Sequence, residues 1–176
     1  MKGVGVTAWK CGRSADLFRG ESDNQKMSKH EEADLILKLY ELRREPTMRQ
    51  ARDWYAMEFN PQSAADVKQA MFSEHSAHLR MVTSYWDMAA ALVNHGAISL
   101  DLFNDTNGEY FLVFSRVEQI LAEIRAMMGP QFLGNLEKLV DATPNGRERS
   151  AMVRERMKSI RAELTAAQKQ KVAGQS

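Results

Sequence analysis

The stretch LRMVTSYWDMAAALVNHG, residues 79–96, decides the fold class. Its apolar residues recur every three or four positions, which is the period of one face of an α-helix. They are Leu79, Val82, Trp86, Ala89, Ala90 and Val93. Gly96 follows at the place where a helix commonly ends in a left-handed residue. We therefore expect an all-α fold built around a core helix over about Glu74–His95, with Trp86 buried.

Further helices are predicted ahead of this core helix. Residues 28–31, Ser-Lys-His-Glu, form a capping-box pattern, which begins a helix. That helix should end at Pro46, because proline has no backbone N–H and its ring clashes with the carbonyl four residues earlier. A second helix is expected from Pro46 to Phe59. A third begins at Ser63, and it either breaks near Ser73 or continues into the core helix.

The segment Glu109–Met128 is consistent with two structures. Tyr110–Phe114 follows Asn107-Gly108, a pair typical of hairpin turns, so it could be a strand. No second β-rich run exists to pair with it, however. Apolar residues also continue at helical spacing as far as Gly129-Pro130, which ends helices. We therefore predict a helix over Glu109–Met128.

Short elements complete the predicted bundle. Ser99–Phe103 is expected to form a helical turn and Asn104–Gly108 a loop. A short helix is predicted over Phe132–Val140, closed by Thr143–Gly146, and a last helix over Arg147–Lys171. The whole is expected to be an irregular or orthogonal bundle of five to seven helices with a protruding C-terminal helix.

The composition is that of a globular chain without a strong global charge. Of 176 residues, 24 are Lys or Arg and 23 are Asp or Glu, so the net charge of +1 gives no general attraction to nucleic acid or to an anionic membrane. The single cysteine, Cys11, excludes an intrachain disulfide. No run approaches the roughly 20 apolar residues of a membrane span. We expect a cytoplasmic protein with no membrane partner.

We divide the chain into three parts. Residues 1–27 are expected to be a flexible N-terminal extension, because they lack apolar periodicity and are rich in small and polar residues. Either Met27 is the natural initiator and a leader precedes it, or the extension is native. Residues 28–144 are expected to form the helical bundle domain, and residues 145–176 a basic amphipathic helix and tail.

Catalytic patterns are not recognisable in the sequence. There is no Gly-x-Ser-x-Gly elbow and no Walker loop. Gly3-Val4-Gly5 lacks the rest of a dinucleotide fingerprint, and Cys11 lies in the predicted extension. Acidic residues are plentiful, but nothing singles out a catalytic pair. We assign no catalytic residue and no cofactor, and favour a protein that is not an enzyme.

Glu74, His75 and His78 are weak candidates for a metal site. Two imidazoles and a carboxylate at this spacing can bind a metal, as Glu-x-x-His pairs do in helical-bundle carboxylate proteins. Such sites take ligands from several helices, and no second Glu-x-x-His occurs here. His75 also falls on the apolar stripe of the core helix, so packing is the favoured interpretation.

The C-terminal helix is the most informative surface. Residues 147–171 hold eight basic and three acidic residues, a local charge of +5, whereas residues 28–146 sum to −6. Apolar residues alternate in steps of four and three, as in a short coiled-coil seam. We expect this seam to be an interface with another protein or with a second copy of the chain, through Val153, Met157, Ile160 and Leu164.

A family resemblance rests on two segments. Leu39–Arg44 reads LYELRR, and Tyr85–Ile98 reads YWDMAAALVNHGAI. Together they resemble a group of small all-helical bacterial proteins catalogued as a domain of unknown function. The resemblance covers about residues 34–140. It implies an all-helical fold and carries no activity or site residue. Members often have an N-terminal membrane segment, which we do not expect here.

Three functional hypotheses follow. The leading one is a non-catalytic helical interaction or scaffold protein that self-associates through the C-terminal helix. The first alternative is a helical-bundle protein that binds a metal or a small apolar ligand near His75, His78 and Trp86. The second is RNA or ribosome association through the basic C-terminal helix. That alternative is weaker, because no aromatic residues interleave with the basic ones.

Overall fold

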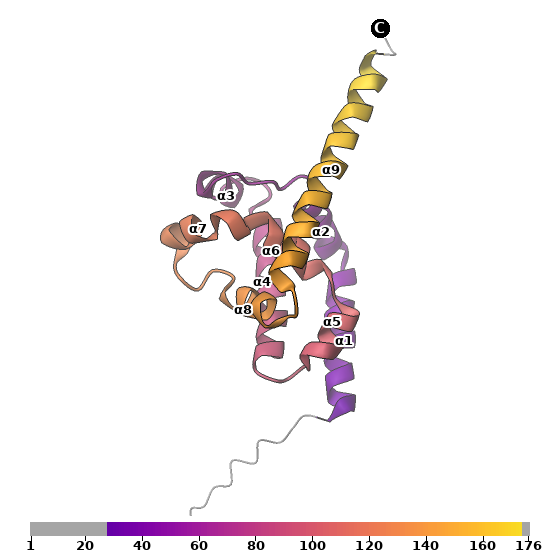
Figure 1. The fold of residues 1–176 in the computed structure, drawn as a ribbon, viewed down its shortest axis with the longest axis vertical. Helices are drawn as coiled ribbons and strands as arrows, with labels where there is room; N and C mark the ends of the chain where they lie inside the picture. The colour runs from indigo at the N-terminus through magenta and orange to yellow at the C-terminus, as the bar shows by residue number, and fades with distance from the viewer. Residues whose placement is uncertain (1–27, 174–176) are drawn as a thin grey trace, which may run out of the picture.

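The computed structural model describes residues 28–173, and the predicted flexible extension and Cys11 lie outside this range. Within it the fold is an all-α helical bundle, as predicted, and no strand is present in the described part of the chain. Nine α-helices and one short 3-10 helix follow one another along these residues (Figure 1). This exceeds the expected five to seven helices for two reasons. The turn predicted over Ser99–Phe103 is a longer helix, and the single helix predicted over Glu109–Met128 is divided into three pieces.

The first two helices follow the predicted stop and start signals. α1 spans Lys29–Arg44, and Ser28 and Glu31 form the capping box in both directions. The Ser28 N–H donates to Glu31 at 2.8 Å, and the Glu31 N–H donates to the Ser28 hydroxyl at 3.3 Å. α2 spans Pro46–Met57 with proline in its first turn, where the missing N–H costs no hydrogen bond.

A break separates the third helix from the core helix, which settles the alternative left open by the sequence. α3 spans Ala64–Met71, with a second capping box between Ser63 and Asp66. α4 spans Ser76–Asn94 and contains the predicted apolar face. Gly96 follows it with φ +75°, the left-handed conformation expected of a residue after a helix end.

The segment predicted as a loop at Asn104–Gly108 is largely helical. α5 spans Leu100–Thr106, starting from a Ser99 cap, so it continues past the predicted end at Phe103. Thr106 donates its hydroxyl hydrogen to the Leu102 carbonyl at 2.8 Å, so its side chain is satisfied within the last turn of α5. Asn107 is buried and donates from its amide to the Phe103 carbonyl, capping the helix from its own side chain.

Residues 109–128 are helical, as predicted, but in three pieces. α6 spans Glu109–Val117, the 3-10 helix η1 spans Glu118–Ile120, and α7 spans Leu121–Met128. α8 spans Gly134–Ala142, so the predicted start at Phe132 is two residues too early. The reason is Leu133, whose φ of 52° is left-handed and interrupts any helix there while its side chain is buried.

α4 is the centre of the bundle and packs against α2 and α8. Its Trp86 is fully buried, as predicted, among large side chains from several helices that are themselves buried: Tyr55, Phe103, Tyr110 and Phe114. Two tyrosines bond between helices. The Tyr55 hydroxyl donates to the Val113 carbonyl at 3.1 Å, and the Tyr85 hydroxyl donates to the Leu39 carbonyl at 2.7 Å.

The last helix, α9, spans Gly146–Ala173. It packs against α6 and α8 and then extends beyond the body of the molecule (Figure 1). α9 is long enough to span a bilayer but is highly charged, and none of the helices within residues 28–173 combines the length and apolar character that crossing a membrane requires. The fold therefore consists of a packed body and one long helix whose first part packs against that body and whose second part projects from it.

Candidate functional site

Close packing against α8 places the start of α9. Asn145, in the link, has φ 53°, and asparagine tolerates this left-handed conformation better than most residues. A Cβ atom at Gly146 would lie 1.9 Å from the Val140 carbonyl oxygen, so only glycine allows the two backbones to approach this closely. The link predicted at Thr143–Gly146 therefore sets the direction in which α9 leaves α8.

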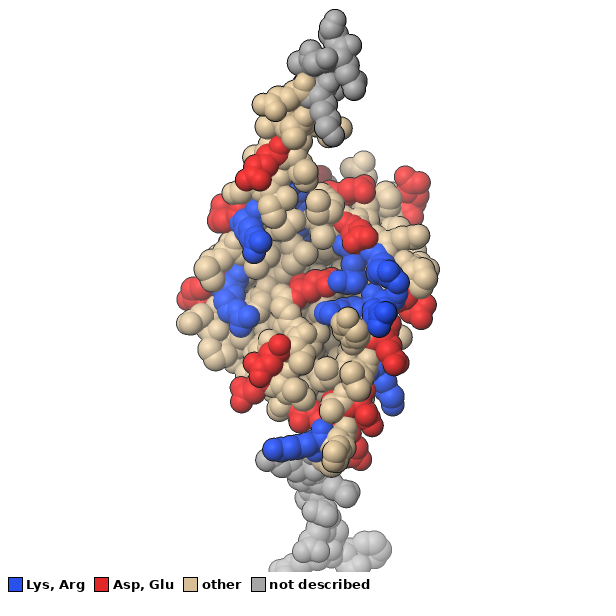
Figure 2. Space-filling model, turned by 90° about the vertical axis from the view of Figure 1, so that its right-hand side faces the viewer, with Lys and Arg blue, Asp and Glu red and all other residues tan. Residues whose placement is uncertain are grey.

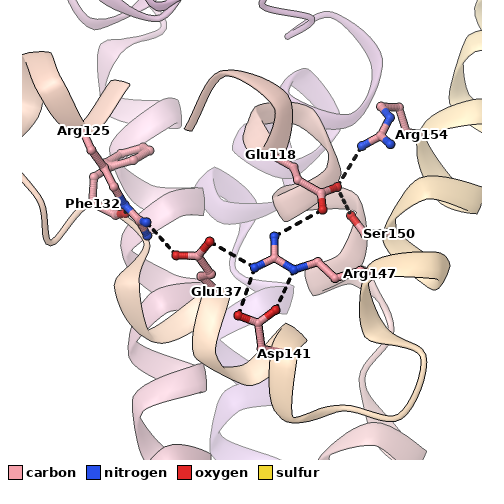
Figure 3. Close-up of polar contacts among 8 residues, drawn as sticks. All are labelled: Glu118, Arg125, Phe132, Glu137, Asp141, Arg147, Ser150 and Arg154. Atoms are coloured by element: carbon pink, nitrogen blue, oxygen red, sulfur yellow. Dashed lines mark hydrogen bonds and ion pairs between the residues drawn. The ribbon is translucent and has the colours of Figure 1, made fainter. Parts of the chain in front are cut away.

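A polar network joins the first two turns of α9 to the body (Figure 3). Arg147 is its centre, and its guanidinium contacts carboxylates of Asp141, Glu137 and Glu118 at 2.6, 3.0 and 3.3 Å. Hydrogen bonds to Asp141 are the main reason that the pKa of Arg147 is raised, so the guanidinium stays charged. The network therefore orients α9 relative to α8 and η1.

Three further side chains complete the network at its ends. The Ser150 hydroxyl and Arg154 Nη1 both bind the Glu118 carboxylate, at 3.0 and 2.8 Å. Arg125 Nη1 donates to Glu137 at 2.6 Å. Burial alone would raise the pKa of Glu137, but the hydrogen bonds from Arg125 and Arg147 outweigh it and hold that pKa below its ordinary value.

Of the four residues predicted as an interface, three pack at least partly on the body of the bundle and one lies beyond it. Val153 packs against the hydrophobic core, and Met157 and Ile160 are half-buried. Leu164 continues the same stripe but is 50% exposed. Every side chain of residues 162–170 is exposed. The seam is thus covered by the chain's own body in its first half and uncovered in its second.

The basic residues of α9 are not all free to bind a partner. Arg147 and Arg154 are engaged by carboxylates of the body, and Lys158 pairs with Glu155 on α9 itself at 2.8 Å. In Figure 2, acidic and basic side chains are mixed over the face in view, and the projecting segment is mostly uncharged. Carboxylates of the body therefore compensate two of the basic residues of α9, Arg147 and Arg154.

The histidine candidates lie together but not as the sequence suggested. α4 begins at Ser76, so His75 is its N-cap residue and lies outside the helix. Its ring stacks on Trp54 at 4.9 Å, and its centroid lies 5.6 Å from that of His78. The ring contacts of Trp86 are with Tyr85 and Tyr110 instead. Among the described residues, Trp86 therefore makes no ring contact with His75 or His78.

Glu74 contributes little to this cluster. Its side chain is 88% exposed, and its carboxylate lies 3.8 Å from His75 Nε2. Nowhere in residues 28–173 do three His, Cys, Asp or Glu side chains converge in a metal-binding arrangement. Beside the cluster, Trp54, Phe59 and His75 line an open groove of about 250 Å³.

Sequence reasoning missed the carboxylates that hold α9. Glu137 and Asp141 are four residues apart, so they share one face of α8, and they precede the basic helix directly. That spacing could have predicted an acidic face on α8 that binds the basic start of α9. Glu118 gave no such signal, because its partners Ser150 and Arg154 lie more than 30 residues away and depend on the tertiary fold.

Comparison with known proteins gives one family match. The family described as Domain of unknown function (DUF4760) matches residues 29–143, which is more than half of the chain and includes the segments on which the resemblance rests. No curated protein and no solved structure matches the chain significantly. The matched region covers the body of the bundle through α8 and ends just before α9 begins at Gly146.

Proposed function

Since the chain belongs to the family described as Domain of unknown function (DUF4760), we propose that it is a non-catalytic interaction protein that self-associates through the projecting end of α9. The observation that carries this proposal is the exposed second half of the helix. The stripe that packs on the body at Val153, Met157 and Ile160 continues to Leu164, where nothing in the described chain covers it.

A helix end of this kind gains from a partner. Residues 162–170 make no tertiary contact that buries a side chain, and short helical segments without packing are marginally stable in water. Alanines at 162, 166 and 167 favour the helix, and Ala167, three residues after Leu164, continues the stripe with a small side chain. Docking the uncovered stripe would therefore stabilise this half of α9.

The counterpart that fits best is the outward face of α1 in a second copy. Leu37 and Tyr40 are 59% and 51% exposed there, and the exposed Asp34 and Glu41 lie on the same face of the helix. Because the only charged residues of the uncovered segment 162–170 are Glu163 and Lys169, the match rests on apolar side chains, Leu164 on α9 and Leu37 and Tyr40 on α1. The two elements point to opposite ends of the molecule (Figure 1), so one copy cannot make the contact with itself.

Two copies related by a two-fold axis would make this contact twice. Each newly buried leucine contributes about 1.5 to 3 kcal/mol at most, and association opposes this with a large loss of rotational and translational freedom. We therefore expect a concentration-dependent dimer in place of a permanent one.

The mass in solution of the full chain, measured over a concentration series, tests the proposal. Leu164→Asp on α9 and Leu37→Asp on α1 should each shift the equilibrium to monomer. Ala166→Asp introduces the same charge on the opposite face of the helix and should leave the dimer intact. A wild-type chain that stays monomeric at every concentration would overturn the proposal. If Leu164→Asp acts and Leu37→Asp does not, α1 is not the counterpart.

The cytoplasmic location expected from the sequence belongs to this proposal, and cell fractionation checks it. Two measurements distinguish the alternative functions, RNA association and metal binding, from self-association. Retention on RNA that falls steeply with salt and is lost in Lys169→Gln would favour nucleic-acid association through α9. Bound metal that copurifies with the protein would favour the histidine cluster. Neither outcome is expected, because Arg147 and Arg154 are engaged by carboxylates of the body and His75 stacks on Trp54.

A further inference from the structure

A small cavity with basic walls lies where the α2–α3 loop, α6, η1 and α9 meet. Its volume is about 70 Å³, and Arg116, Arg154 and Lys158 line it together with the amide side chains of Asn60 and Gln119. No Asp or Glu is among its lining residues. A water molecule needs roughly 10 to 15 Å³ by a comparable measure, so the space accommodates several waters or one small anion.

Arg116 is the unusual member of this wall, because it is partly buried without a carboxylate. Its guanidinium donates to the Ala56 carbonyl and to Asn60 Oδ1, both neutral acceptors. No Asp or Glu of residues 28–170 forms an ion pair with it. Burial is the main reason that the pKa of Arg116 falls to about 10, and the nearby positive charge of Arg161 lowers it further.

Arg161, which does not itself line the cavity, adds a second uncompensated charge near Arg116. It donates to the Phe59 carbonyl at 3.1 Å, and it forms no ion pair with any carboxylate in the described part of the chain. The neighbouring charges are balanced by contrast. Arg154 belongs to the network with Glu118, and Lys158 pairs with Glu155. The excess of positive charge at this place is therefore two.

Hydrogen-bond donors in the cavity wall are also unsatisfied. Nε of Arg116 and Nε of Arg154 are both buried, and neither has an acceptor. An unpaired buried donor on a charged group is costly, and native proteins usually satisfy it with protein or with a bound group. Because Arg116 and Arg154 line the same cavity, an anion bound in it is a candidate acceptor for each guanidinium.

We propose that this cavity binds a phosphate group, with Arg116 and Arg154 as its principal ligands and Lys158 at its mouth. A phosphate is a dianion near neutral pH, so it balances the two uncompensated guanidinium charges. Its oxygens accept charge-assisted hydrogen bonds from arginine, which matches phosphate geometry well. The small volume favours free phosphate or the terminal phosphate of a small molecule over a larger ligand.

Thermal unfolding of the full chain in inorganic phosphate, compared with chloride at equal ionic strength and pH 7.5, tests this proposal. A ligand that binds only the folded state raises Tm, and at about ten times Kd the rise should be about 3 to 5 °C. The response should disappear in Arg116→Gln and decrease in Lys158→Gln. Arg156→Gln removes an exposed arginine of α9 that does not line the cavity, so its response should equal that of the wild type.

Phosphorus NMR on the folded wild-type chain provides a direct second measurement, so the test does not depend on whether Arg116→Gln folds. Line broadening of inorganic phosphate that chloride does not reverse supports binding, and a parallel titration with glycerol phosphate identifies which source is preferred. Equal effects of phosphate and chloride in the wild type would overturn the proposal. An undiminished response in both Arg116→Gln and Lys158→Gln would also overturn it.

Discussion

Arg147 binds Asp141 through two parallel hydrogen bonds, from Nε to Oδ1 at 2.6 Å and from Nη2 to Oδ2 at 2.9 Å. This bidentate pair joins the first turn of α9 to the last turn of α8 across the tight link at Asn145 and Gly146. The same guanidinium also binds Glu118 and Glu137. One side chain therefore connects three elements and controls the direction in which α9 leaves the body.

Replacing Arg147 with alanine should destabilise the fold by about 1 to 2 kcal/mol, because it leaves partly buried carboxylates without their main partner. The effect is not larger because the Arg147 side chain is 41% exposed and solvent screens its ion pairs. Urea unfolding followed by circular dichroism measures the change. Arg156→Ala, an exposed arginine on the same helix, should change stability by less than about 0.5 kcal/mol. Equal effects of the two substitutions would contradict this role.

Trp86→Ala should cost about 3 to 5 kcal/mol, because it removes the largest fully buried side chain from the centre of the core. Met88, two residues further along α4, is 44% exposed. Its replacement by alanine is the matched control and should cost less than about 1 kcal/mol. Thermal melts of the two variants, compared with the wild type, measure the difference. A Trp86→Ala melt identical to the wild type would show that this face is not the core.

Gly146→Ala should destabilise the protein by at least about 1 to 3 kcal/mol, because the new methyl group meets backbone that cannot move without separating α8 from α9. Gly134 provides the comparison. A Cβ there meets only Gln131 Oε1 at 3.7 Å, and Gly134 begins α8, so alanine should be neutral or stabilising by up to about 1 kcal/mol. Urea midpoints of the pair test the prediction, which fails if both variants behave alike.

Removal of metal should leave the protein unchanged. Structural transition-metal sites need about four ligands, and the cluster offers two imidazoles with an exposed Glu74. Protein purified without chelators should contain no stoichiometric transition metal, and EDTA should not alter its Tm. Elemental analysis and a melt with and without EDTA are sufficient. Stoichiometric metal that disappears in His78→Ala would contradict this and favour the alternative function.

The helices that could be predicted are those whose signals are local. The capping box at Ser28, the proline at Pro46 and the periodicity of residues 79–93 each depend on neighbours within a few residues, and each is confirmed. The break at η1 and the left-handed Leu133 were missed. Phe114, Val117, Leu121 and Ile124 continue a helical pattern through the break at η1, and the leucine at position 133 carries no turn signal.

The candidate sites likewise combine features that depend on local sequence with features that depend on the tertiary fold. The interface stripe could be read from its spacing, but its division into covered and uncovered halves depends on where the body ends. Arg116 and Arg154 lie on α6 and α9, and each falls inside an ordinary helical pattern. Their meeting at one cavity is a tertiary property. Only packing shows that Arg116 is left without a carboxylate.

The last prediction concerns acid stability and follows from Glu137. Arg125 and Arg147 hold its pKa below the ordinary value of 4.5 in the folded state. At a pH below 4.5 the unfolded chain therefore binds a proton at this position before the folded chain does. The stability from this group is fully present above about pH 4.5, and it is lost as the pH falls through the folded pKa.

Glu137→Gln should be less stable than the wild type at pH 7, and the difference should narrow as the pH falls below 4.5, because the wild type loses an ionic contribution that the variant never had. Urea unfolding between pH 3 and pH 7 measures this difference directly. Glu123→Gln, an exposed position on α7, is the control and should follow the wild type throughout. A constant difference between Glu137→Gln and the wild type at every pH would mean that Glu137 acts through packing and not through its charge.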